Sequence, residues 1–205
     1  MSKRDELRDK ALQNLQQHAV LMLNGHFDFG NGFHGTTYLN PHQLFRNPST
    51  IWRFAQDLLD VVPQVILEDT DVVAGPVMGG ALLAHTIAGL LDSRRPLGRE
   101  ATSFAPFQVG PDGPSLSRFY QNVVKGQRVL LADDVRNTGQ TLAQCAELIR
   151  QAGGTVIASV QIYDRLEAIV DLGVPNISLA EYRRPGRVPA AECPQCKAGV
   201  PVTAF

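Results

Sequence analysis

The chain has 205 residues, of which 19 are basic and 20 acidic, and its formal net charge at pH 7 is −1. This length suits one α/β domain, and the absence of a basic run argues against binding to nucleic acid or to a membrane surface. We therefore expect a small-molecule ligand. No apolar run approaches the roughly 18 residues of a membrane span and no signal peptide is evident, so we expect a cytoplasmic protein. The cysteine count of three argues against a secreted disulfide framework.

The first predicted elements are an amphipathic helix and a short hairpin. Apolar residues recur at helical spacing over residues 5–23. Residues 26–40 then alternate aromatic and polar side chains around an Asn-Gly pair, which predicts two short strands whose polar groups could line a site. His26 and His34 have no carboxylate or thiol neighbours at ligand spacing, so we expect ordinary polar histidines and no metal there.

A second helix and the first strand of a buried sheet follow. Residues 47–63 begin with Asn-Pro-Ser and carry one apolar face, which predicts a helix. Residues 71–74 form a buried strand, residues 75–81 a glycine loop, and an apolar helix continues to about Leu91. The loop glycines would let backbone amides approach a ligand closely, although a plain tight turn is the alternative.

The most informative stretch covers residues 128–142. An apolar strand over 129–132 ends at Asp133 and Asp134, and a small polar loop over 137–141 opens a helix near Gln140. Two buried carboxylates need a cation, hydroxyl donors or water, and a helix start with free N–H groups binds anions. A plain strand-to-helix connection would need neither both acids nor both threonines. This loop and the glycine loop should open onto one crevice, because both leave the carboxyl ends of parallel strands.

The segment between these two loops, residues 94–124, carries the least decisive sequence pattern. Residues 102–107 are a candidate strand, and residues 110–114, with two prolines, predict a mobile loop. Residues 116–124 are expected to return to the sheet.

The remainder predicts a helix over 140–152, a strand over 155–162, and a further strand over 177–180. Cys145 shares a helix face with apolar residues and is expected in the core. The tail carries Cys193 and Cys196 as Cys-x-x-Cys, which is half of a structural zinc site and would need a second pair from another subunit. We expect a reduced structural tail.

The acidic pair followed by Thr-Gly-Gln-Thr resembles the phosphoribosyl diphosphate signature of type I phosphoribosyltransferases. Residues 26–40 and the Cys-Pro-Gln-Cys tail resemble bacterial orotate phosphoribosyltransferases, although Asn31 and Gly35 replace two serines of that pattern. The resemblance implies an α/β fold in which helices flank a central, mainly parallel sheet and a small hood is formed by N-terminal and C-terminal segments. It implies one domain over 1–205, with a hood of about 1–45 plus the C-terminal segment and a core of about 46–165.

The same resemblance implies transfer of a phosphoribosyl group to orotate with Mg²⁺, giving orotidine 5′-monophosphate and diphosphate in pyrimidine nucleotide biosynthesis by a homodimer. The implied catalytic residues are Asp133, Asp134 and Arg118, with the two acids holding Mg²⁺ directly or indirectly. Asn137 and Arg165 are implied at the base. The implied phosphoribosyl diphosphate site comprises Gly75, Met78, Gly79, Gly80, Asp133, Asp134, Val135, Arg136, Asn137, Thr138, Gly139, Gln140 and Thr141.

The loop that closes over diphosphate in the family departs from its usual pattern here. Relatives carry basic residues in this loop, partly for the neighbouring subunit, but this chain has no lysine between Ala81 and Lys125. Arg118 is the first candidate to replace that charge and Arg99 the second. Two alternatives therefore stay open: a phosphoribosyltransferase for another base, and a non-catalytic phosphoribosyl-binding regulatory protein.

Overall fold

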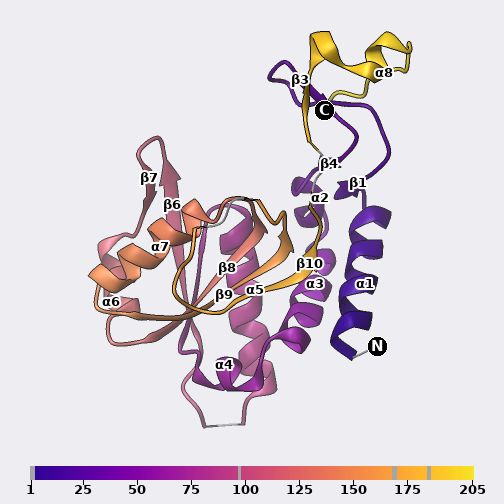
Figure 1. Ribbon diagram of the computed structural model, residues 1–205. Coiled ribbons are helices and arrows are strands. Elements are labelled where there is room, and N and C mark those ends of the chain that lie inside the picture. The colour runs from indigo at the N-terminus through magenta and orange to yellow at the C-terminus, as the bar shows by residue number, and fades with distance from the viewer. Residues whose placement is uncertain (1–2, 97, 168–169, 184–185) are drawn as a thin grey trace.

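The structure is a computed structural model that describes residues 3–96, 98–167, 170–183 and 186–205. A central sheet lies between two layers of helices, and a smaller group of strands stands beyond one end of it (Figure 1). The elements are α1 (Lys3–Gln17), β1 (Leu21–Met22), β2 (Phe27–Asp28), β3 (Phe33–Gly35), β4 (Tyr38–Leu39), α2 (His42–Phe45), α3 (Pro48–Val61), α4 (Gln64–Asp69), β5 (Val72–Pro76), α5 (Gly79–Arg94), β6 (Ser103–Gly110), β7 (Gly113–Ser115), α6 (Arg118–Val124), β8 (Arg128–Arg136), α7 (Gln140–Gln151), β9 (Thr155–Asp164), β10 (Asn176–Glu181), β11 (Val188–Pro189), the 3-10 helix η1 (Ala190–Glu192) and α8 (Pro194–Lys197).

The central sheet has the strand order β10-β9-β8-β5-β6-β7. All neighbours pair in parallel except β6 and β7, which form an antiparallel hairpin. The expected α/β fold with a mainly parallel sheet is therefore confirmed. The strand β8 runs past Ala132, where the sequence predicted its end, because pairing with β9 continues from Asp133 to Arg136. The acidic pair thus lies among the last residues of a paired strand rather than after it.

Helices cover both faces of the sheet, and alternate strand residues serve the two cores. Val73 and Leu130 pack on one side with α1, α3 and α5, whereas Val72 and Leu131 pack on the other with α6 and α7. Burying one such side chain is worth about 1.5–3 kcal/mol, so these two layers hold the strand ends rigidly. Cys145 lies in the second core as expected, where burial raises the pKa of its thiol to about 12.

Two local predictions were wrong and a third was right in part. The first helix ends at Gln17 rather than at residue 23, and β1 follows it and pairs with β4. Residues 118–124 form α6 instead of a strand, because Leu116, Tyr120 and Val124 recur at helical spacing and face the second core. The predicted loop over 110–114 is the tip of the β6–β7 hairpin, which projects beyond the sheet (Figure 1). Its proline at position 114 lies on the outermost strand, where a missing N–H is tolerated.

The ends of the chain are joined in a structure that we call the cap, meaning residues 25–36 and 188–205. Its sheet has the order β11-β3-β2, and the tail beyond α8 adds an isolated bridge between Phe27 and Thr203. The ring of Phe205 stacks on Tyr38 at 4.5 Å between centroids. The cap stands apart from the central sheet at the upper right of Figure 1, whereas α1 packs against α3 and β10. Among the described helices, none has the length and apolar character that crossing a membrane requires.

Candidate active site

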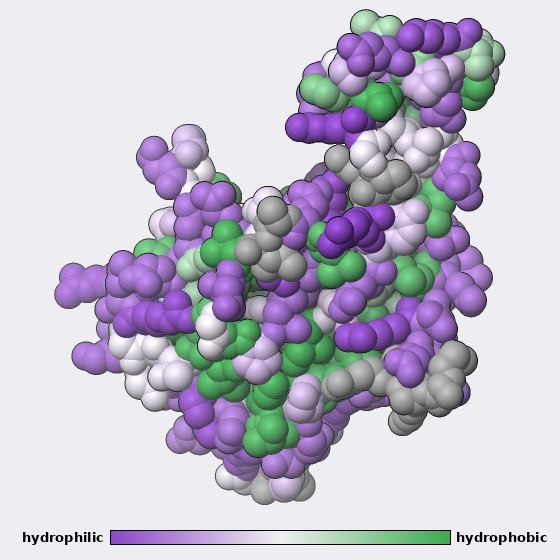
Figure 2. All heavy atoms as spheres, in the orientation of Figure 1, coloured by the Kyte–Doolittle hydropathy of each residue, from purple (hydrophilic) through white to green (hydrophobic). Residues whose placement is uncertain are grey.

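A wide cavity lies at the carboxyl edge of the sheet, between the ends of β5 and β8. The chain order reverses there, since β6 continues from β5 in one direction and β9 and β10 continue from β8 in the other. Such a switch point is where open α/β sheets bind ligands. Figure 2 shows this edge hollowed between the projecting hairpin and the cap. The cavity has a volume of about 480 Å³ and is lined by Phe29, Tyr38, Leu39, Pro41, Pro76, Val77, Met78, Gly79, Gly80, Val109, Asp133, Asp134, Val135, Asn137, Thr141 and Arg165.

The acidic pair forms part of the cavity wall. Asp133 is partly buried, and its Oδ1 accepts the backbone N–H of Asp134 at 3.0 Å. Desolvation first, and then the neighbouring charge of Asp134, raise the pKa of Asp133 well above its usual 3.8. In the described part of the chain, no basic side chain forms an ion pair with either carboxylate. The pair therefore presents oxygen acceptors suited to hydroxyl groups or to a divalent cation.

The glycines at 75, 79 and 80 serve a close approach that differs from the expected one. A Cβ on Gly79 would lie 2.3 Å from Asp134 Oδ2, and a Cβ on Gly80 would lie 2.8 Å from Asp133 Oδ1. A Cβ on Gly75 would meet the Gly80 carbonyl oxygen at 2.3 Å. These glycines allow the glycine loop over residues 75–81, the first loop of the site, to pack directly onto the acidic pair. The sequence predicted that these positions need space, and contact with the acidic pair accounts for part of that need. The approach of their backbone amides to a ligand stays a prediction.

The loop over 137–141 forms a second, smaller hollow at the start of α7. Gly139 is the N-cap residue and adopts φ +83°, a left-handed conformation that favours glycine. The hollow has a volume of about 100 Å³ and is lined by Asp133, Val135, Arg136, Asn137, Thr138, Gly139, Gln140, Thr141 and Leu142. The Nε of Arg136 is buried and has no hydrogen-bond partner among the described residues. Free helix N–H groups, threonine hydroxyls and this guanidinium make the hollow chemically suited to an anion.

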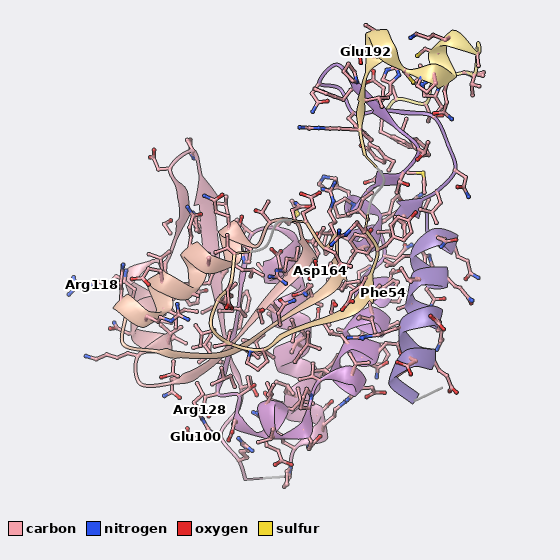
Figure 3. All side chains as sticks on the ribbon, in the orientation of Figure 1. Phe54, Glu100, Arg118, Arg128, Asp164 and Glu192 are labelled. Atoms are coloured by element: carbon pink, nitrogen blue, oxygen red, sulfur yellow. The ribbon has the colours of Figure 1, made fainter. Side chains whose placement is uncertain are left out.

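A buried ion pair fixes the strand ends that carry the outer site residues. Arg136 Nη1 donates to Asp164 Oδ2 at 3.0 Å, and both side chains are almost fully enclosed. Asn176 Nδ2 also donates to Asp164 Oδ2, at 3.2 Å. Figure 3 places Asp164 at the same edge of the sheet as the cavity. Arg136, expected among the phosphoribosyl diphosphate ligands, thus also joins β8 to β9.

Arg165 follows this ion pair directly and faces Asn137. Its backbone N–H donates to the Arg136 carbonyl at 3.0 Å, and its Nη1 donates to Asn137 Oδ1 at 2.6 Å. Its Nη2 lies 3.1 Å from Glu167 Oε1. The two residues expected at the base are therefore in contact at the cavity wall. A guanidinium has five N–H donors, so several remain for a ligand carboxylate.

The two arginines proposed to replace the loop lysines lie elsewhere in the subunit. Arg118 begins α6, is exposed and points away from the sheet (Figure 3), and it lines neither hollow. Arg99 lines a separate cavity with Arg95 and Arg128, and it donates to the Glu68 carbonyl. Figure 3 shows Arg128 at the opposite edge of the sheet from Asp164. Arg99 is therefore held at the amino ends of the strands.

Several lining residues were not singled out from the sequence. Phe29, Tyr38, Leu39 and Pro41 form the wall on the side of the cap, and Val109 comes from the hairpin. The aromatic and polar alternation over residues 26–40 predicted that this segment could line a site, but it did not distinguish which side chains face inward. The aromatic members were the available signal, because planar ligands pack well on aromatic rings.

Comparisons with known proteins agree with this arrangement. The family described as "Phosphoribosyl transferase domain" matches residues 51–172. An orotate phosphoribosyltransferase of Erythrobacter litoralis is 33% identical over 182 residues, covering 89% of each chain, and one of Caldanaerobacter subterraneus is 32% identical over 195 residues, covering 95% of each. The crystal structure of orotate phosphoribosyltransferase from Aeropyrum pernix shares the fold at a TM-score of 0.63, with 24% identity over 82% of this chain and 92% of that one. The chain therefore belongs to the phosphoribosyltransferase family and, within it, is most similar to the orotate phosphoribosyltransferases.

Proposed function

We propose that this protein transfers the 5-phosphoribosyl group of phosphoribosyl diphosphate to orotate, which gives orotidine 5′-monophosphate and diphosphate in pyrimidine nucleotide biosynthesis. The observation that carries this proposal is the single cavity in which the acidic pair, the 137–141 loop and the Asn137–Arg165 contact meet. An anion-binding loop, two carboxylates and a guanidinium are the groups that a phosphorylated sugar and a carboxylated base require.

The phosphoribosyl diphosphate side follows from the geometry of the two loops. The N–H groups and hydroxyls of Thr138 and Thr141, together with the buried Arg136 guanidinium, would hold the 5′-phosphate in the smaller hollow. Asp133 and Asp134 would accept hydrogen bonds from the ribose hydroxyls. The first loop, with Gly75, Met78, Gly79 and Gly80, would direct backbone amides at the diphosphate.

The acidic pair also fits Mg²⁺, a hard cation that prefers carboxylate oxygens and water. The observation behind this fit is that two adjacent carboxylates share the cavity wall and that Asp133 is desolvated without a compensating cation among the described residues. Asp133 and Asp134 would hold the ion, directly or through water. Bound Mg²⁺ supplies positive charge that stabilises the departing diphosphate.

The base would lie between the cap and the carboxyl edge of the sheet. Phe29 and Tyr38 offer aromatic surface to a planar ring, and Arg165 offers a planar fork to its carboxylate. Asn137 orients Arg165 through their hydrogen bond. These groups distinguish orotate from uracil, which is the same ring without the carboxylate.

The positive side chain that closes over the diphosphate is proposed to come from a second subunit. Arg118 points away from its own cavity, so a homodimer is needed for it to act in catalysis. Arg99 is engaged at the far edge of the sheet. The homodimer, the cytoplasmic location, and the division into a hood of about 1–45 plus the C-terminal segment and a core of about 46–165 remain predictions.

Turnover by the purified protein tests the proposal. The protein is assayed with Mg²⁺ and phosphoribosyl diphosphate against orotate, uracil and adenine, and diphosphate release is measured. We expect diphosphate release with orotate but not with uracil or adenine. This release should be lost in an Asp133→Asn plus Asp134→Asn variant. Release with another base would change the substrate, whereas tight phosphoribosyl diphosphate binding without release for any base would favour the regulatory alternative.

A further inference from the structure

Four side chains that bind transition metals converge inside the cap. His26 directly precedes β2 and His34 lies on β3, whereas Cys193 and Cys196 come from the tail around α8. One ligand atom from each of the four lies within 4.8 Å of all the others. Figure 1 shows the same arrangement at the level of the chain, with α8 beside β3 although more than 150 residues separate them in sequence. The Cys-x-x-Cys pair therefore has its complement in its own chain.

The distances between these atoms match a tetrahedral zinc centre. His26 Nε2 lies 3.4 Å from Cys193 Sγ and 3.5 Å from Cys196 Sγ, and Cys196 Sγ lies 3.3 Å from His34 Nδ1. With bonds of about 2.3 Å to sulfur and about 2.05 Å to nitrogen, tetrahedral ligands would be about 3.6 Å apart for a nitrogen and sulfur pair. Two nitrogen ligands would be about 3.3 Å apart, and the two imidazole nitrogens here are 3.0 Å apart. A small outward movement of the ligands would admit the ion.

The outer nitrogens of both histidines face acceptors, as metal-binding histidines usually do. His26 Nδ1 lies 2.9 Å from the Val200 carbonyl oxygen, to which it can only donate. This contact assigns the proton to Nδ1 and leaves the lone pair of Nε2 directed at the two sulfurs. His34 Nε2 lies 4.0 Å from Asp28 Oδ1, on the side away from the cluster. Partners of this kind orient metal-bound imidazoles.

We propose that His26, His34, Cys193 and Cys196 form a structural zinc site that fastens the tail to the N-terminal strands of the cap. Two nitrogen and two sulfur ligands in tetrahedral array select zinc, and four protein ligands leave no open position for chemistry. Three of the four residues are buried. From the sequence we expected the two histidines to be ordinary polar residues. The thiols were not considered as their partners, because 158 residues lie between His34 and Cys193 and the sequence alone does not show that they meet.

The site acts at a point where the cap has little other support. The sheet of the cap contains strands of two or three residues, and residues 199–205 of the tail are exposed. Such short strands do not hold together on their own backbone hydrogen bonds. The cap also supplies Phe29 to the wall of the large cavity, and Phe205 stacks on Tyr38 beside it. Zinc would thus stabilise the wall of the cavity without touching a ligand in it.

Metal analysis of the full chain, purified without chelator, tests this proposal without any substrate. We expect about one zinc per chain. Replacement of zinc by Co²⁺ should give the strong visible absorption of a tetrahedral site with thiolate ligands. A Cys193→Ser plus Cys196→Ser variant, and separately His26→Asn, should hold less than about a tenth of the wild-type zinc. The matched controls are Cys145→Ala in the core and the exposed His42→Asn, which should keep it.

Three results would overturn the proposal. The first is wild-type protein that carries no zinc and gives no tetrahedral Co²⁺ spectrum. The second is full zinc content in the double cysteine variant. The third is one zinc per two chains, which would mean that the cysteine pairs of two subunits share the ion. If the cysteine variant does not fold, the stoichiometry and Co²⁺ spectrum of the wild-type protein still decide the question, and none of these readings depends on phosphoribosyl transfer.

Discussion

Arg165 Nη1 donates a hydrogen bond of 2.6 Å to Asn137 Oδ1, and this contact joins the ends of two neighbouring strands. Behind it, the buried pair of Arg136 and Asp164 holds the same two strand ends together. The guanidinium therefore reaches the cavity from a backbone that cannot shift easily. A side chain fixed in this way loses little further conformational entropy on binding a carboxylate, which favours specificity for a carboxylated base.

Replacing Arg165 with lysine tests this role. An ammonium cannot reproduce the planar fork, so hydrogen bonds to a charged partner worth about 1.5–3 kcal/mol are lost. We expect the Michaelis constant for orotate to rise about tenfold to a hundredfold, and that for phosphoribosyl diphosphate to move much less. Arg53→Lys, an exposed change on α3, is the control. Unchanged orotate kinetics in the Arg165→Lys variant would place the carboxylate contact elsewhere.

The packing of the first loop on the acidic pair predicts an effect of a single methyl group. In Gly79→Ala, the new Cβ would lie 2.3 Å from Asp134 Oδ2 and would push that carboxylate out of place. A misplacement of about 1 Å near the reacting groups costs roughly a hundredfold in rate, so we expect a loss of that order in turnover with the fold retained.

Gly89→Ala is the matched control because it lies in the same helix, α5, and its Cβ would meet no atom within 4 Å. Alanine is also the better helix former, by about 1 kcal/mol, so this variant should be at least as stable as the wild type. Steady-state rates and thermal melting on both variants give the comparison. Equal rates for Gly79→Ala and Gly89→Ala would show that the position of Asp134 is not critical.

The raised pKa of Asp133 predicts how stability depends on pH. Because its pKa in the folded protein lies above the usual 3.8, the folded state binds the proton more tightly and loses stability as the pH rises from 3.8 through the raised pKa. We expect Asp133→Asn to raise the free energy of unfolding at pH 7, and this gain to shrink toward pH 4. Urea unfolding of variant and wild type at both pH values measures it.

Asp71 provides the opposite case in the same sheet. Its hydrogen bonds with Arg128 lower its pKa, so it contributes stability above pH 3.8 that is lost as the pH falls through the lowered value. We expect Asp71→Asn to lower the free energy of unfolding at pH 7. If Asp133→Asn destabilised the protein at pH 7 as Asp71→Asn does, the acidic pair would serve the fold rather than the ligand.

The sequence predicted the carboxyl edge of the sheet better than the cap, and the reason is physical. Strand, acids, loop and helix over residues 128–142 are consecutive, so local patterns determine their order and the edge that they share. The contact of Gly79 with Asp134 and the meeting of His34 with Cys196 depend on tertiary packing, which no local period encodes. The helix over 118–124 was missed because the chain was expected to return to the sheet directly after the proline-containing loop, whereas α6 packs on the second core first.

The last prediction concerns the left-handed residue at the start of α7. In Gly139→Ala, a Cβ at φ +83° is strained by about 1–2 kcal/mol and lies 3.1 Å from Arg136 Nε. Relief of this strain would rotate the 138–140 amides, which are proposed to hold the 5′-phosphate. We therefore expect a loss of phosphoribosyl diphosphate affinity, measured by calorimetry, that exceeds any effect on orotate.

Gly153→Ala separates this loss from simple destabilisation. Gly153 follows the other end of α7 at φ +84°, so its replacement introduces the same backbone strain, and its Cβ would meet only Lys125 at 3.6 Å. Both variants should melt at a similarly lowered temperature, but only Gly139→Ala should lose affinity. Equal affinity losses in the two variants would mean that strain anywhere in α7 weakens binding, and the anchor would then have to be sought outside the 137–141 loop.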